Sequence, residues 1–354
     1  MRISTYELRA LCVPLDRSIG DSQIDPLDRF RVVVLELVAD TGEVGVGFDT
    51  IETPLETIAE ALEESVLGAS PFAIRNRVTR PRGGKYGAKP FDRLVDVAVW
   101  DLCAKYLDLP LYELMGGTDP RVPAYASGLA FHHDDETTRR IYEDFRDQGF
   151  GAAKVKVGYP SVEDDLERLA LVHDVMGEDC RLLVDANEAF SPKEAIRRTH
   201  RYREAGFDIY WLEDPILRDD RKGIRRVAEA LPETHVNVGE YVGFEEKRSL
   251  LEHGACDVLH VHGYSNGRRE ATLAAAYGVP VAFGNTPGEF GVHAAAALPE
   301  VTYLEYAALG WDRLLTEPVT FENEMAVAPD RPGHGLEVAD SAVEQYGTDE
   351  LERE

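Results

Sequence analysis

Cysteine, basic side chains and long apolar runs are all scarce in this chain of 354 residues. The four cysteines, Cys12, Cys103, Cys180 and Cys256, are widely separated and form no C-x-x-C pair, which argues against a zinc knuckle or a disulfide framework. No apolar stretch approaches membrane-spanning length, and the first residues lack the apolar core and cleavage site of a secretory leader. We therefore expect a cytoplasmic protein with no membrane partner.

The charge of the chain is strongly one-sided. Lysine and arginine number 38 against 65 aspartate and glutamate residues, a formal net charge of −27. Such a surface repels nucleic acid and anionic membranes, so neither is expected as a partner. The acids are spread along predicted helices, which is typical of a solvated surface. We take this as the basis for the hypothesis that the protein comes from a halophile with a high-salt cytoplasm. The polar segment 346–354 is expected to be a frayed end.

Residues 1–120 read as a mixed α+β domain. Alternating strand patterns at 31–39 and 44–48 suggest a hairpin, and apolar residues at helical spacing follow at 55–66 and 91–107. The resulting prediction is a small domain that precedes a larger one.

From residue 121 to about 310 the pattern changes to short apolar strands that alternate with polar-faced helices, which calls for a parallel sheet. The predicted strands end near Ser127, Lys156, Asp185, Glu213, Glu240, His262, Asn285 and Glu305. Eight such units suit an α/β barrel of the TIM type, whose active site lies at the carboxyl ends of its strands. An open doubly wound sheet is the alternative, but no helix opens with G-x-G-x-x-G, and Gly45-Val46-Gly47 lies in a hairpin. Residues 311–354 are expected to pack back on the first domain.

Charged residues occupy the ends of the predicted strands. Lys154 and Lys156 end one strand, and Asp185, Glu213 and Glu240 end the next three at intervals of 27 to 29 residues. Carboxylates that converge on one rim would repel each other unless a cation lies among them. All-oxygen ligation favours a hard cation, so we infer a site for Mg²⁺ before Mn²⁺.

These motifs resemble the enolase superfamily and, within it, the mandelate racemase-like group (mandelate racemase/muconate lactonizing enzyme family). The resemblance rests on VDVAVWDLCAKYLDLPLYELMGG at 95–117 and on AKVKVGYP, VDAN, WLEDP, VGE and YLE further along the chain. It implies a (β/α)7β TIM-like barrel under an N-terminal α+β capping domain, with Asp185, Glu213 and Glu240 as ligands of Mg²⁺. It also implies a small-molecule carboxylate as substrate, and we expect a homo-oligomer.

The resemblance also implies roles for the other polar residues. Lys156 looks like the base that removes the proton α to the substrate carboxylate, while Lys154 supplies positive charge beside that carboxylate. A free lysine is protonated at neutral pH, and a neighbouring ammonium group and Mg²⁺ are expected to depress the pKa of Lys156. Glu305, if protonated, donates a hydrogen bond to the substrate; the alternative is a structural acid at the strand end. Asn187 is expected to contact substrate or metal-bound water.

The opposite wall departs from the family pattern. The mandelate racemase-like group typically has an aspartate at the end of the sixth strand and a histidine at the end of the seventh, and this chain has His262 and Asn285. Asn285 cannot carry a proton and is expected to bind substrate. His262 is the candidate second acid, because its ordinary pKa suits proton donation near neutrality; a structural histidine is the alternative.

Two further histidine motifs raise other possibilities. His260-Val261-His262 could belong to a zinc-dependent barrel hydrolase, but there the H-x-H pair is expected on the first strand rather than the sixth. His132-His133-Asp134 is expected in a loop at the barrel rim, although it could begin a solvated helix.

The missing dyad favours β-elimination over two-base racemisation. We therefore expect a Mg²⁺-dependent hydro-lyase that abstracts an α-proton to give a metal-stabilised enolate, an acid-sugar (aldonate-type) dehydratase. The alternatives are a racemase or epimerase of a 2-hydroxy acid and a diverged relative that binds metal without turnover.

Overall fold

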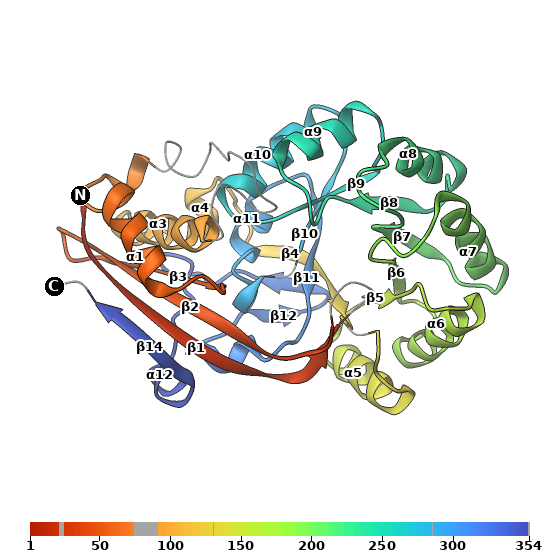
Figure 1. Cartoon of the computed structure of the whole chain (residues 1–354), viewed down its shortest axis with the longest axis horizontal. Coiled ribbons are helices and arrows are strands. Elements are labelled where there is room, and N and C mark those ends of the chain that lie inside the picture. The colour runs from red at the N-terminus through yellow and green to blue at the C-terminus, as the bar shows by residue number, and fades with distance from the viewer. Residues whose placement is uncertain (21–24, 74–90, 130, 285, 353–354) are drawn as a thin grey trace.

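A computed structural model of the chain describes residues 1–20, 25–73, 91–129, 131–284 and 286–352. Within these residues a parallel barrel lies beside a smaller antiparallel sheet, and both chain ends lie on the side of that sheet (Figure 1). Asn285, one of the predicted site residues, lies outside the described residues.

Parallel strands alternate with helices around the closed barrel. The strands are β4 (Arg121–Ser127), β5 (Ala152–Lys156), β6 (Arg181–Asp185), β7 (Ile209–Glu213), β8 (His235–Val238), β9 (Val258–Val261), β10 (Val281–Phe283) and β11 (Val301–Tyr306). The helices between them are α5 (Asp135–Asp147), α6 (Val162–Met176), α7 (Pro192–Glu204), α8 (Arg221–Ala230), α9 (Phe244–Glu252), α10 (Ser265–Ala275) and α11 (Val292–Ala297). Pairing of β11 with β4, in which Glu305 lies opposite Tyr125, closes the ring and confirms the predicted (β/α)7β barrel.

Apolar side chains fill the lower part of the barrel interior. The buried members of this layer are Tyr125, Ala152, Leu183, Trp211, Val258 and Ala282. The rings of Tyr125 and Trp211 meet edge to face with their centroids 5.2 Å apart. Since side chains alternate along a strand, the next inward positions toward the carboxyl ends of the strands lie directly above this apolar layer.

The smaller domain, the capping domain, is an antiparallel sheet covered by helices. Its strands β1 (Ile3–Ile19), β2 (Leu27–Ala39) and β3 (Val44–Thr50) pair in chain order, and its helices are α1 (Leu55–Ser65), α3 (Asp92–Tyr106) and α4 (Leu111–Leu114). A Cβ atom on Gly45 would lie 2.2 Å from the carbonyl oxygen of Ala98, and one on Gly47 would lie 2.4 Å from that of Leu94. The two glycines therefore let α3 pack directly on β3, which explains this G-x-G without a nucleotide.

The end of the chain returns to both domains. β12 (Thr320–Glu322) pairs with β13 (Met325–Val327), which pairs antiparallel with β4. After α12 (Asp340–Tyr346), β14 (Gly347–Glu352) pairs antiparallel with β1, with Leu351 opposite Leu8 (Figure 1). The prediction of a frayed end is therefore wrong: β14 satisfies the backbone groups of an edge strand, and its polar composition reflects exposure rather than disorder.

Helix α3 fastens the capping domain to the barrel. Asp96 accepts hydrogen bonds from the backbone N–H and the hydroxyl of Ser265, at 2.8 and 2.5 Å, at the start of α10. Trp100 Nε1 donates to the same hydroxyl at 2.9 Å. Burial raises the pKa of Asp96 to about 6, although the hydrogen bonds from Ser265 act in the opposite direction. Because Asp96 is buried and both of its carboxylate oxygens accept hydrogen bonds from Ser265, it holds the two domains in one orientation.

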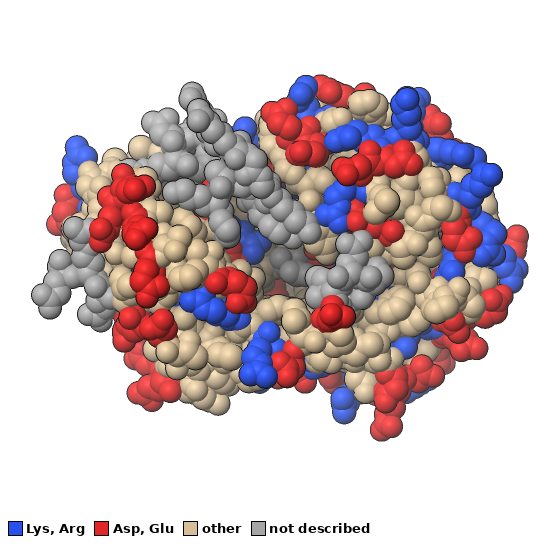
Figure 2. Space-filling model, in the orientation of Figure 1, with Lys and Arg blue, Asp and Glu red and all other residues tan. Residues whose placement is uncertain are grey.

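The described surface carries the scattered acidic side chains that the sequence predicts. Acidic side chains are scattered over both the capping domain and the barrel rather than gathered in one patch (Figure 2). None of the described helices is both long and apolar enough to cross a membrane.

Candidate active site at the carboxyl ends of the barrel strands

Strand register brings distant residues into one row at the carboxyl ends of the strands. Lys156 lies opposite Asp185, Asp185 lies opposite Glu213, and Glu213 lies opposite Asn237. These side chains point into the barrel above the apolar layer, where they are almost completely shielded from solvent. Residues separated by nearly a whole βα unit in the sequence therefore become direct neighbours.

Lys154 lies at the centre of this group. Its Nζ is 2.8 Å from Glu213 Oε1, 2.9 Å from Glu305 Oε1 and 3.5 Å from Asp185 Oδ2. Burial by itself lowers the pKa of Lys154, but the charges of Glu213 and Glu305 outweigh burial and raise the pKa well above its ordinary value. Lys154 is therefore a permanent positive charge inside the barrel.

Lys156 lies one inward position closer to the mouth of the barrel. Its Nζ donates to Asp185 Oδ2 at 2.6 Å and to Asn187 Oδ1 at 2.6 Å. Burial lowers the pKa of Lys156 and Lys154 lowers it further, yet Asp185 outweighs both and the pKa is raised. Among the described side chains, the carboxylate in direct contact has a stronger effect on this pKa than the neighbouring ammonium group, and the lowering expected with Mg²⁺ stays a prediction.

Glu305 differs from its expected protonation state. Burial favours its neutral form, but contact with Lys154 outweighs burial and holds the pKa of Glu305 below its ordinary value. Contact with Lys154 therefore favours the ionised form of Glu305, and the hydrogen bond expected of a protonated Glu305 stays a prediction.

Carboxylates outnumber ammonium groups in this part of the barrel. The acids are Asp185, Glu213, Asp214, Glu240 and Glu305, and the lysines are Lys154 and Lys156. Burial, helped by neighbouring carboxylates, raises the pKa of Glu213 well above its ordinary value and that of Glu240 to about 7. Asp214 is also buried with a raised pKa, and its Oδ2 has no hydrogen-bond partner among the described residues. The site thus holds more negative charge than its own cations neutralise.

A hard cation fits this donor set. Asp185, Glu213 and Glu240 offer only oxygen ligands, and an added positive charge would relieve the repulsion that raises the pKa values of the two glutamates. In the described part of the chain, no three His, Cys, Asp or Glu side chains already surround one point, because Asp185 and Glu213 face the lysines instead. These side chains would exchange lysine contacts for metal contacts.

The wall formed by β9 and the residue that follows it carries two histidines, of which His260 is fully buried and His262 is half-buried. The rings of His260 and His262 have centroids 4.8 Å apart, and His260 Nδ1 is 3.7 Å from Glu213 Oε1. Burial lowers the pKa of His260 to about 3 and that of His262 well below its ordinary value. His262 is therefore a neutral imidazole, which differs from the expected proton donor with a pKa near neutrality.

Two polar residues of the interior escaped the sequence analysis. Asn237 Nδ2 donates to Glu213 Oε2 at 3.2 Å, and the ring of Tyr125 lies 5.5 Å below Lys154 Nζ. The signal for Asn237 was present, since an amide within the short buried strand VNV requires a partner. Tyr125 gave no such signal, because tyrosine is ordinary in strands.

The motif His132-His133-Asp134 forms the loop between β4 and α5, as expected. His132 Nε2 lies 2.8 Å from Ser18 Oγ, His133 Nε2 lies 2.9 Å from the carbonyl oxygen of Ser18, and Asp134 caps α5 through the N–H of Thr137. The loop therefore contacts the capping domain at the barrel mouth.

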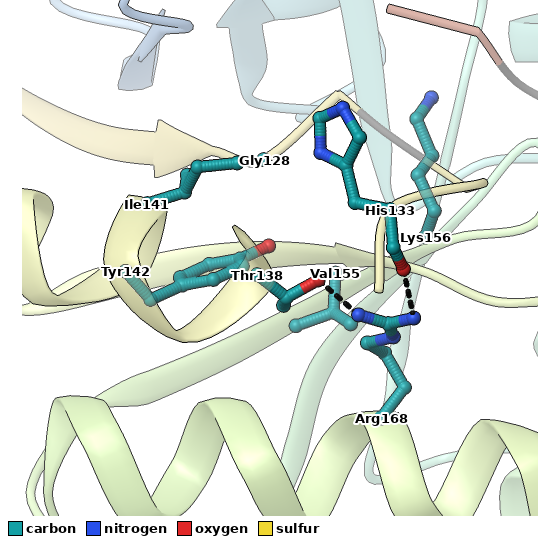
Figure 3. A pocket seen from close by; sticks show the side chains of 8 residues that line it. All are labelled: Gly128, His133, Thr138, Ile141, Tyr142, Val155, Lys156 and Arg168. Carbon is teal, nitrogen blue, oxygen red and sulfur yellow. Dashed lines mark hydrogen bonds between the residues drawn. The ribbon is translucent and has the colours of Figure 1, made fainter. Parts of the chain in front are cut away.

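A small pocket opens between this loop, α5, α6 and β5. It is lined by Gly128, His133, Thr138, Ile141, Tyr142, Val155, Lys156 and Arg168. Arg168 spans it and donates to the hydroxyl of Thr138 and to the carbonyl oxygen of His133 (Figure 3). Both Val155 and Lys156 of β5 line the pocket, so it adjoins the residues of the charged interior.

Family comparisons cover both domains of the chain. Residues 12–116 match the family described as mandelate racemase / muconate lactonizing enzyme, N-terminal domain, and residues 137–342 match the family described as enolase C-terminal domain-like.

Individual relatives match over nearly the whole chain. An arabinonate dehydratase of Saccharolobus solfataricus is 31% identical over 89% of this chain and 90% of its own, and a 3,6-anhydro-α-L-galactonate cycloisomerase of Streptomyces coelicolor is 28% identical over 92% and 93%. A solved structure from Mesorhizobium loti, provisionally named mandelate racemase, is 41% identical with a TM-score of 0.92 over 98% of this chain and 95% of its own. A racemase structure from Streptomyces coelicolor with bound magnesium is 26% identical with a TM-score of 0.87 over 98% and 100%.

The first prediction concerns the cation. Glu213→Gln removes one charged ligand, and we expect it to weaken Mg²⁺ binding at least tenfold, since a neutral amide is a poorer ligand than a carboxylate. Isothermal titration of the protein with MgCl₂ measures the change, and the unfolding temperature without metal serves as the control for folding. Unchanged Mg²⁺ affinity in a folded variant would remove Glu213 from the ligand set.

Proposed function

The chain belongs to the enolase superfamily, in the group of mandelate racemase and muconate lactonizing enzyme, and we propose on that premise that it is a Mg²⁺-dependent enzyme that removes the α-proton of a carboxylate substrate. Within that group we propose an acid-sugar dehydratase, which converts an aldonate-type 2,3-dihydroxy acid to its 2-keto-3-deoxy product. The observation that carries the proposal is the row of Lys156, Asp185 and Glu213 above Lys154 on adjacent strands.

Each residue of this row has a proposed task. Asp185, Glu213 and Glu240 hold Mg²⁺, which supplies positive charge to the substrate carboxylate. Lys154, with its raised pKa, adds a second positive charge beside that carboxylate. Lys156 would become neutral once Asp185 exchanges its ammonium contact for the metal, and its Nζ would then accept the α-proton while the electron pair of the C–H bond moves toward the carboxylate. Asn187, which accepts a hydrogen bond from Lys156, orients its amine.

Dehydration also requires the C3 hydroxyl to leave as water. The electron pair returns from the carboxylate to form the C2–C3 double bond, and the hydroxyl takes one proton with it. The resulting enol becomes the 2-keto-3-deoxy acid when its C2 hydroxyl loses a proton and C3 gains one. Lys156, once it has received the α-proton, could supply the proton that the leaving hydroxyl takes. His262 could do so only if substrate binding raises its pKa, because its imidazole is neutral here. Glu305 accepts hydrogen bonds in this scheme because Lys154 keeps it ionised.

The wall opposite Lys156 favours elimination over racemisation. A two-base racemase needs an acid or base on each face of the α-carbon, and the β9 wall carries neutral His260 and His262 without an aspartate partner. The arabinonate dehydratase relative agrees with this proposal. The cycloisomerase and racemase relatives make an isomerase of a 2-hydroxy acid the second candidate.

A substrate panel tests the proposed reaction. Purified protein with MgCl₂ is incubated with aldonates and aldarates, and 2-keto acid formation is measured. Formation of a 2-keto-3-deoxy acid supports the dehydratase. Inversion at C2 without loss of water supports the isomerase, and saturable Mg²⁺ binding without turnover on any acid supports a diverged, non-catalytic relative.

On a working substrate, Lys156→Ala should stop both turnover and exchange of the α-hydrogen with deuterated solvent, because it removes the base itself. His262→Asn should slow product formation more than exchange if His262 protonates the leaving hydroxyl, and should leave both nearly unchanged if Lys156 does so. Deuterium incorporation followed by NMR separates the two steps. Exchange that survives the loss of Lys156 but disappears with His262 would reverse the assignment of the base.

We also propose that the protein works at high ionic strength in the cytoplasm, on the basis of the net charge of −27 and its spread over both domains (Figure 2). Salt screens repulsion between surface carboxylates, since the Debye length falls to about 3 Å at about 1 M. The free energy of unfolding should therefore rise between about 0.1 and about 1 M KCl, where the screening length shortens about threefold. Urea unfolding at each salt concentration measures this change, and a value that falls with salt would contradict the proposal.

A further inference from the structure

A second layer of polar contacts joins the loops that follow the three proposed metal ligands. Glu188 lies three residues after Asp185, Arg218 lies five residues after Glu213, and Tyr241 directly follows Glu240. The three loops follow β6, β7 and β8, which are adjacent strands of the barrel.

Arg218 contacts both of the other loops. Its backbone N–H donates to Glu188 Oε1 at 2.9 Å, its Nε donates to the same oxygen, and its NH2 group donates to Glu188 Oε2 at 2.5 Å. Its NH1 group donates to the carbonyl oxygen of Tyr241 at 3.3 Å, and its guanidinium carbon lies 4.7 Å from the centre of the Tyr241 ring. The Glu188 side chain is 4% exposed and that of Arg218 is 22% exposed, so solvent screens this bidentate pair only in part.

The backbone in the same loops is strained. Asn187, Glu188 and Asp214 have φ angles of 41°, 64° and 36°, in the left-handed region that non-glycine residues rarely adopt. The Glu188 N–H donates to the carbonyl oxygen of Asp214 at 2.7 Å, which links the strained positions of the β6 and β7 loops to each other. Such conformations persist where surrounding contacts hold them in place.

We propose that Arg218 is a positioning residue for the magnesium site, and that its paired contacts to Glu188 and Tyr241 keep the loops after Asp185, Glu213 and Glu240 in their ligand-bearing arrangement. This inference rests on the metal site of the proposed function and adds a residue that does not touch the metal. The hydrogen bonds of the guanidinium would favour metal binding by positioning the loops, whereas its positive charge would oppose metal binding.

The two roles predict opposite changes in metal affinity. Arg218 is a cation near the acidic cluster and lowers the pKa of Asp214. If only its charge mattered, Arg218→Ala would make the site more negative and tighten Mg²⁺ binding. If it positions the loops, the same change weakens Mg²⁺ binding.

The test is titration with MgCl₂ alone, with no substrate present. Arg218→Ala should raise the Kd for Mg²⁺ about tenfold to a hundredfold, the usual effect of losing an outer partner of a metal site. Arg218→Lys keeps the charge but loses the bidentate fork, so it should also raise the Kd, by a smaller factor. Arg225→Ala is the matched control, because Arg225 forms an exposed pair with Glu229 on the following helix and should leave the Kd unchanged.

A double-mutant cycle gives an independent measure. If the pair acts as one unit, Glu188→Ala together with Arg218→Ala should weaken binding no more than the stronger single change. Near-ultraviolet circular dichroism checks that each variant is folded. If Arg218→Ala does not fold, the Kd of Arg218→Lys for Mg²⁺ tests the positioning role instead.

The outcomes separate this inference from the proposed function. Wild-type protein that binds Mg²⁺, together with a Glu213→Gln variant that binds it poorly, supports the metal site. An unchanged or lower Kd in a folded Arg218 variant then overturns the positioning role alone, as does an equal loss in Arg225→Ala. Wild-type protein with no saturable Mg²⁺ binding would overturn both.

Discussion

The excess of buried negative charge at the carboxyl ends of the barrel strands is the constraint on which the rest of the structure depends. Lys154 contacts Glu213 and Glu305, and Lys156 contacts Asp185, yet the remaining carboxylates still have raised pKa values. The apolar layer below this group, which includes Trp211 and Tyr125, contributes no charged side chain. The fold therefore holds acids in an arrangement that is unfavourable without a further cation, and this is a property of a binding site rather than of a stabilised core.

The capping domain contacts the barrel on two sides of this site. Asp96 holds α10, which begins just after His262, and the loop with His132 and His133 contacts Ser18 at the other side of the mouth. Neither contact touches the charged row. Both fix the walls around it, and they join two domains whose sequences lie far apart.

Hydrogen-bonded polar side chains form a second layer around the proposed metal ligands. Asn237 contacts Glu213 from inside the barrel, whereas Arg218 and Glu188 join the loops above it. The left-handed conformations of Asn187 and Asp214 lie between these layers. Strain beside a charge cluster is expected where the backbone must present side chains to a ligand rather than to each other.

The sequence by itself determined the barrel and the place of each proposed metal ligand on its rim. Hydrophobic periodicity and the even spacing of Asp185, Glu213 and Glu240 depend only on local chain geometry, so they could be read without coordinates. The protonation states of the site residues and their contact partners could not be predicted in this way. Glu305 is ionised, His262 is neutral and Lys156 has a raised pKa because of charges and burial contributed by other strands. The same holds for the pairing of β14 with β1 and for the contact of Arg218 with Glu188. In both cases nothing in the sequence of one segment predicts which segment it contacts. Only the tertiary structure decided these features, because electrostatic fields and strand neighbours act through space and not along the chain.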